Sequence, residues 1–209
     1  YSTHPGESSG YYTGAADSSR SLQQDRPGLG TKWGEDKESQ VKTTYFIRHS
    51  KSRPWKTGKA FYNDKDGALA MLKGRSHWRH RGPVEIADGL VSFGLQGTLG
   101  KYLSSYRSGN DYVFLGNDGN QYSIVVNNHS TSRLEVVFSV DGLDVVDGQP
   151  ASFTKRGYVL DAGEKLRIKG FRRSESSVAA FRFGSVSESY SQQLHGTSRN
   201  VGVIGVAVF

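Results

Sequence analysis

The chain has 209 residues, no cysteine and a net charge of +7, with 26 glycines and 5 prolines. The absence of cysteine excludes disulfide bonds, thiol catalysis and thiolate metal sites. No run approaches the roughly 18 apolar residues that a membrane-spanning helix needs, and the glycine-rich composition favours short strands and turns over a helical bundle.

The first 32 residues are rich in serine and glycine and poor in apolar side chains. Such a segment buries too little apolar surface to offset the entropy of ordering, so we expect it to form an extended polar arm. Two arrangements remain open, in which the arm packs along its own domain or lies on a neighbouring subunit. In the second arrangement, the contacts are expected from Tyr11, Tyr12, Leu22, Leu29 and Trp33.

Residues 33–82 form a basic, aromatic-containing segment that we expect to pack on the core. Residues 43–49 are predicted to form a strand, with Tyr45 and Ile47 on one face. Residues 67–74 are predicted to form a short helix, with Asp64 or Asp66 near its positive N-terminal end and Gly74 as its stop.

Strands are predicted at residues 83–87, 90–95, 112–115 and 120–127. Asn117, Asp118 and Gly119 lie between the last two. These residue types accept a positive φ, so the pattern predicts a short hairpin there.

The clearest alternation lies in residues 133–140, where Leu134, Val136, Phe138 and Val140 share one face. Further strands are predicted at 157–160, 165–170 and 178–183. Residues 201–209 are apolar on both faces, which predicts a central, covered strand. The sequence therefore predicts an all-β fold, a β-sandwich or jelly roll over residues 83–209, with at most one short helix.

Four sequence blocks in the C-terminal half resemble an uncharacterised family of exported bacterial proteins. They are SVDGLDVVDGQPAS (139–152), RGYVLDAGEKLRIKGFRRS (156–174), SVAAFRFGSVSESY (177–190) and NVGVIGVAVF (200–209). The resemblance covers roughly the last 90 residues and implies a bacterial β-domain, with no activity or cofactor attached to it. A chain that opens with Tyr1 rather than Met also favours a processed, exported protein, extracellular or on the cell surface.

The sequence offers few candidates for chemistry. Asp141, Asp144 and Asp147 have oxygen ligands suited to calcium, but their spacing differs from an EF-hand loop and fits two β-turns. His77 and His80 would share a face on a helix and face opposite sides on a strand, and neighbouring arginines oppose a zinc ion. No nucleophile elbow, catalytic triad or phosphate loop is present, so we expect a protein that is not an enzyme and needs no cofactor.

The excess positive charge is local. Residues 42–81 carry eleven basic residues against Asp64 and Asp66, a net charge of +9, whereas residues 82–209 are neutral. Basic side chains neutralise phosphates, sulfates or uronates, and tryptophan rings stack on bases or sugars. The residues predicted to bind an anionic partner are Lys51, Arg53, Trp55, Lys56, Lys59, Arg75, Trp78, Arg79 and Arg81.

Two functions follow from these patterns. The first is a non-catalytic structural subunit of an exported fibre or surface layer, a homo-polymer in which the arm adds a strand to a neighbouring copy. The alternative is an exported binding module for an anionic polymer, either an acidic polysaccharide or a nucleic acid.

Overall fold

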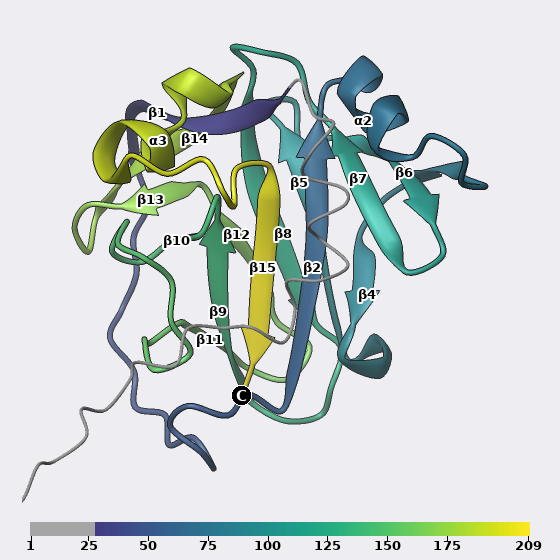
Figure 1. Cartoon of the computed structure of the whole chain (residues 1–209). Coiled ribbons are helices and arrows are strands. Elements are labelled where there is room, and N and C mark those ends of the chain that lie inside the picture. The colour runs from purple at the N-terminus through teal and green to yellow at the C-terminus, as the bar shows by residue number, and fades with distance from the viewer. Residues whose placement is uncertain (1–27) are drawn as a thin grey trace, which may run out of the picture.

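The computed structural model describes residues 28–209, and within them the strands form two packed sheets (Figure 1). The first sheet has the order β1 (Leu29–Glu38), β14 (Ser177–Ser185), β8 (Gln121–Asn128), β5 (Val91–Gly97) and β4 (Val84–Ile86). Two short strands extend it, with β12 (Lys165–Ile168) paired to β8 and β13 (Gly170–Arg172) paired to β14.

The second sheet has the order β10 (Leu143–Asp144), β9 (Leu134–Val140), β15 (Val203–Val208), β2 (Lys56–Asn63), β7 (Asp111–Leu115), β6 (Ser104–Ser108) and β3 (Trp78–Arg81). The strand β11 (Tyr158–Leu160) pairs with β9. Strands β2 and β7 run parallel, and the other pairs of this sheet are antiparallel. The predicted β-sandwich is therefore present, but it is not confined to residues 83–209, because β1, β2 and β3 are strands of its sheets.

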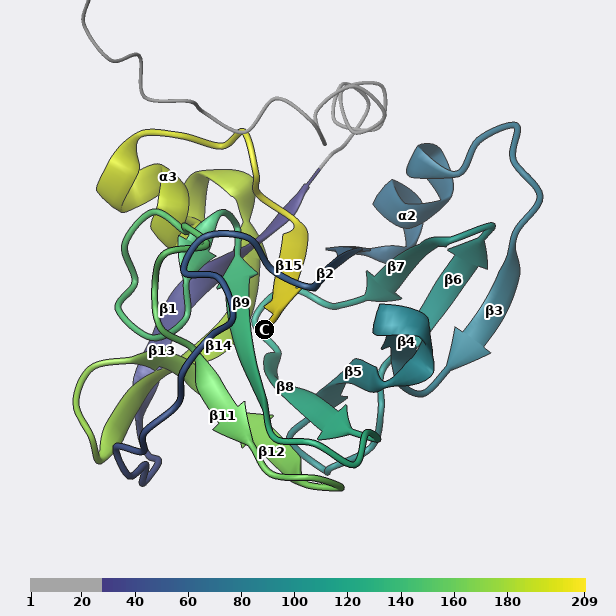
Figure 2. The same ribbon diagram turned by 90° about the horizontal axis from the view of Figure 1, so that it is seen from below.

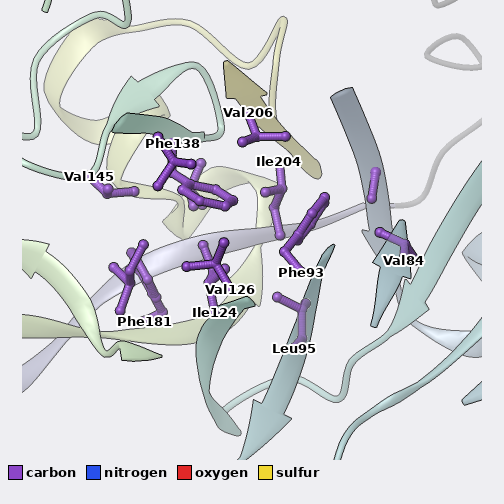
Figure 3. Packing of buried hydrophobic residues seen from close by; sticks show 14 of the residues in the cluster. Val84, Phe93, Leu95, Ile124, Val126, Phe138, Val145, Phe181, Ile204 and Val206 are labelled. Carbon is purple, nitrogen blue, oxygen red and sulfur yellow. The ribbon is translucent and has the colours of Figure 1, made fainter. Parts of the chain in front are cut away.

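Side chains from the inner faces of both sheets form the core (Figure 3). Phe93 and Ile124 come from the first sheet, and Phe138 and Ile204 from the second. The ring centroids of Phe93 and Phe138 lie 5.6 Å apart in an edge-to-face contact, so the two sheets interlock rather than merely face each other.

The predicted central strand is confirmed: β15 has β2 on one side and β9 on the other, and most of its side chains are buried. The alternation in residues 133–140 is also confirmed, because Leu134, Val136, Phe138 and Val140 all join the core. The outer face of β9 is covered as well, since Glu135 and Val137 are buried.

The predicted hairpin at residues 117–119 is wrong. β7 belongs to the second sheet and β8 to the first, so this connection crosses between sheets instead of joining neighbours. Gly119 does adopt a positive φ of 79°, but a turn signal specifies only the local backbone and not the partner of the next strand.

The predicted strand at residues 43–49 is also wrong, since no strand covers this stretch. Tyr45 and Ile47 are both exposed to solvent, at 79% and 72%. Arg48 points inward instead. Without a neighbouring strand, the segment is held by side chains rather than by a backbone ladder.

Arg48 anchors this segment through a buried ion pair. Its Nε donates to Glu135 Oε2 at 2.7 Å and its Nη2 to Glu135 Oε1 at 2.9 Å. Further donations reach the carbonyl oxygens of Lys51, Phe153 and Lys155, and the guanidinium lies over the Phe209 ring. Burial alone would raise the pKa of Glu135, but hydrogen bonds from Arg48 and the Gly157 amide hold that pKa below its ordinary value.

The short helix is present as α2 (Lys65–Met71), close to the predicted bounds. Asp64 caps it by accepting a hydrogen bond from the Gly67 amide at 2.7 Å. Gly74 has a positive φ of 74°, three residues after the helix ends. A second, six-residue helix, α3 (Tyr190–His195), was not indicated by the sequence pattern and packs beside β1. Single 3₁₀ turns cover Ala87–Gly89 and Val186–Glu188.

The composition predicts that residues 29–32 belong to the arm. In the structure, these residues begin β1 and belong to the folded body. Leu29 is buried in its own core, so it is not available to a neighbouring copy. Trp33 packs against Tyr190 and Phe171 of its own chain, with ring centroids 4.4 and 6.1 Å away. Tyr11, Tyr12 and Leu22 lie outside the described residues.

A buried polar network joins the start of β1 to the second sheet. The carboxylate of Asp141 accepts hydrogen bonds from the Thr31 amide at 2.7 Å, the Tyr62 hydroxyl at 2.5 Å and the Gly202 amide at 2.8 Å. The Thr31 hydroxyl lies 2.7 Å from the Tyr62 hydroxyl and 2.6 Å from that of Tyr122. Burial first, and then the nearby Asp141 charge, raise the pKa of both phenols well above the ordinary value.

We predict that Asp141→Asn lowers the free energy of unfolding by about 3 kcal/mol, because an amide nitrogen would face buried donors. Asn tolerates the positive φ of 55° at this position, so the substitution tests the carboxylate rather than the backbone. Asp88→Asn is the matched control, since Asp88 also has a φ of 55° but is exposed. Urea unfolding would contradict this account if the two variants lost equal stability.

We predict that Arg48→Lys lowers the free energy of unfolding by about 3 kcal/mol, because a single ammonium group cannot make the paired contacts to Glu135. Arg133→Lys is the control, since Arg133 pairs with Asp161 on the exposed surface. Thermal unfolding should separate the two variants clearly. Equal melting temperatures would show that the buried pair does not hold the segment.

Candidate functional site: a basic edge at β3

The structure divides the predicted anion-binding residues between two places. Lys51, Arg53 and Trp55 lie in the segment that leads into β2, next to the end of β15, where the Trp55 amide donates to the Val208 carbonyl. Trp78, Arg79 and Arg81 lie on β3, the edge strand of the same sheet, with β2, β7 and β6 between it and β15. Figure 2 shows β3 at the far right, with the dark-blue segment that precedes β2 on the left.

Several of the predicted residues are occupied by their own chain. Lys56 pairs with Asp88 at 2.9 Å, and Arg75 pairs with Asp111 at 2.8 Å. The Lys59 ammonium lies over the Phe61 ring, 5.4 Å from its centroid. These three cations are thus partly satisfied without a ligand.

The two arginines of β3 are not neutralised in this way by the described part of the chain. Among the described residues, Arg79 makes only a long hydrogen bond, at 3.4 Å, to the Ser104 hydroxyl. Within residues 28–209, neither Arg79 nor Arg81 has an acidic partner, and both are exposed. Because they stand two positions apart on a strand, the two side chains share one face.

The other face of β3 carries an aromatic row. Trp78 pairs in register with Arg107 of β6, which pairs with Tyr112 of β7. The Arg107 guanidinium lies over both rings, 5.6 Å from the Trp78 centroid and 5.2 Å from that of Tyr112. Trp78 is nevertheless 51% exposed, so about half of its surface remains open to a ligand.

The two histidines take positions on opposite faces of the sheet. The His77 ring lies 5.3 Å from that of Tyr106, and the His80 ring 5.4 Å from that of Tyr112. Tyr106 and Tyr112 sit on opposite faces, since they pair in register with Val113 and Arg107. In the described part of the chain, no three His, Asp or Glu side chains converge to hold a metal ion.

The edge geometry explains why β3 is available. In the part of the chain that is described, β3 pairs only with β6, so its other side has no partner strand. Charged residues on such an edge also prevent pairing with another chain. That role accounts for the arginines, but a half-exposed tryptophan on the edge would work against it.

The sequence did not single out Arg107, Tyr106 or Tyr112 as site residues. Arg107 and the two tyrosines lie on β6 and β7, which become neighbours of β3 only through the sheet order. Residues 104–108 read SSYRS, without an alternation of apolar and polar side chains, so the sequence holds no clear signal for a strand there.

The three aspartates weighed as calcium ligands serve the turns and the core. Asp141 begins the tight turn between β9 and β10, with Gly142 at a φ of 80°. Asp144 Oδ1 accepts from the Val146 amide at 2.8 Å, and Asp147 pairs with Lys155 at 2.7 Å. The geometry of the two turns therefore accounts for the spacing of the three aspartates.

Comparison with protein-family models, curated proteins and solved structures finds no match to this chain. The resemblance of the last 90 residues to an exported bacterial family therefore stays a prediction. No helix within residues 28–209 is long and apolar enough to cross a membrane.

We predict a pH effect on stability from Asp144. Burial raises the pKa of this carboxyl from 3.8 to about 6, so the folded protein binds its proton more tightly than the unfolded chain does. Asp144 therefore adds to the free energy of unfolding at low pH, and this contribution is lost as the pH rises from about 4 to about 6.

The test is Asp144→Asn, whose carbonyl can still accept the Val146 amide. Between pH 4 and pH 7 the variant should gain about 2 kcal/mol of unfolding free energy relative to the original chain. Urea unfolding at several pH values measures this difference. Parallel stability curves for the two proteins would refute the prediction.

Proposed function

We propose that this chain is a non-catalytic binding module for an anionic polymer, and that it binds through the edge strand β3. One observation carries the proposal: Arg79 and Arg81 project from a sheet edge without acidic partners among the described residues, and Trp78 lies half-exposed on the other face of the same edge strand. Unneutralised cations attract phosphate, sulfate or carboxylate groups, and an exposed ring adds stacking contact with a base or a sugar.

The strand conformation suits a polymer rather than a small ion. Side chains two positions apart on a strand are separated by about 7 Å, so Arg79 and Arg81 can contact successive charges of an extended chain. Arg107 and Trp78 extend the same edge from the other face. A single small anion would use only part of this surface.

The role as a structural subunit of a fibre or surface layer stays a prediction, and so does the exported location. Of the residues assigned to the intersubunit arm, Leu29 and Trp33 contact their own chain, and the other three lie outside the described part. The binding module is therefore the function that the described geometry favours.

The proposal predicts salt-dependent binding to labelled heparin or single-stranded DNA, measured by fluorescence anisotropy at about 50 and about 200 mM salt. Replacing both Arg79 and Arg81 with Gln should weaken binding at least about tenfold, because two charge contacts are lost. Trp78→Ala should also weaken it about tenfold through lost stacking.

Lys51→Gln combined with Arg53→Gln is the matched control, because it removes the same charge from the distant segment. It should leave affinity unchanged while circular dichroism shows all variants folded. Equal losses in both double variants would mean that net charge alone, and not the β3 edge, attracts the polymer. If neither heparin nor single-stranded DNA binds, the proposal is refuted.

A further inference from the structure

A hollow of about 430 Å³ lies where the ends of β5, β7, β8 and β14 meet. The loop that joins β5 to β6 forms one wall, and the loop that joins β7 to β8 forms another. Leu103, Leu115 and Phe183 supply its apolar surface. A hollow of this size accommodates one or two rings of a ligand.

The strand register connects this hollow to β3. Arg81 pairs with Ser104 of β6, and Ser105 pairs with Phe114 of β7, so Ser104 stands opposite Leu115. Arg81, Ser104 and Leu115 therefore form one row across three strands, about 10 Å from end to end. A ligand that occupies the hollow can continue onto Arg81 without leaving the surface.

The polar rim of the hollow offers neutral groups. Thr98, Asn117 and Asn120 are exposed, and their side chains make no hydrogen bond within the described residues. A hydroxyl and two amides present both donors and acceptors. This combination matches sugar hydroxyl groups, which also donate and accept.

The charge of the hollow is already balanced. Arg182 donates to the Gly119 carbonyl and pairs with Glu35 at 2.8 Å. The aromatic ring of Phe183 is buried, so the described residues that line the hollow offer no open ring to stack on a base. These features disfavour a phosphate or a nucleobase there and favour a neutral, hydroxyl-rich ring over the leucine surface.

This step rests on the proposed function and specifies its ligand. We propose that the anionic polymer is an acidic polysaccharide, with one neutral sugar residue in the hollow and its acidic neighbours on Arg81 and Arg79. The neutral rim and the basic edge then contact two different parts of the same polymer.

The test compares labelled hyaluronan oligosaccharides, in which neutral and acidic sugars alternate, with single-stranded oligothymidine of the same charge. The original protein should bind the oligosaccharide at least about tenfold more tightly than the DNA. Asn117→Ala combined with Asn120→Ala should remove most of this difference by weakening the sugar complex alone. Gln193→Ala, which deletes an exposed amide on α3, is the matched control and should change neither affinity.

The outcomes separate the two proposals. If both polymers bind with equal affinity and the asparagine variants change nothing, the polysaccharide inference is wrong while the basic edge stands. Binding of the DNA alone would overturn the polysaccharide inference in the same way. If neither polymer binds, the proposed function and this inference fall together.

Discussion

The buried carboxylate of Asp141 is the constraint on which the arrangement of this sandwich depends. β1 lies at the edge of the first sheet, and among the described residues the amide of Thr31 has no neighbouring strand to accept its hydrogen bond on that side. Asp141 replaces that strand with one side chain from the second sheet. The Leu29 amide is satisfied in a similar way by Asn63 at 3.1 Å. Backbone donors at a buried edge require such partners, so these contacts let the two sheets close against each other.

The parts of the sandwich differ in how far the chain itself covers them. The start of β1 is used inside its own molecule, and the outer face of β9 is covered by the segment that Arg48 anchors. At the far end of the second sheet, β3 has no comparable cover among the described residues. The unneutralised arginines are found on that strand. The fold thus protects one side of the sandwich and presents a charged, aromatic edge on another.

Local sequence patterns predicted the strands better than their partners. Alternation placed Leu134 to Val140 in the core correctly, and the turn residues located Gly119 correctly. Neither signal could reveal that β7 and β8 lie in different sheets, because sheet membership depends on contacts between distant segments. The 43–49 segment failed for a related reason: its apolar residues alternate, but a buried ion pair turns the opposite face inward.

The same holds for the candidate site: the sequence located its residues but not their neighbours. Charge counting located the basic segment, and Trp78, Arg79 and Arg81 do lie together on one strand. It could not separate them from Lys51 and Arg53, which are near in sequence to the others but lie across the sheet. Pairing with Asp88 and Asp111 could not be foreseen either, since these acids come from other loops and strands. Which cations remain available is a property of the folded surface.

Native-state hydrogen exchange of the Thr31 and Gly202 amides tests the central role of Asp141 most directly. If the carboxylate closes the sandwich, both amides should exchange only through global unfolding, at the same free energy as the core amides of β15. Exchange of Thr31 at the rate of an exposed loop, while β15 stays protected, would contradict this account.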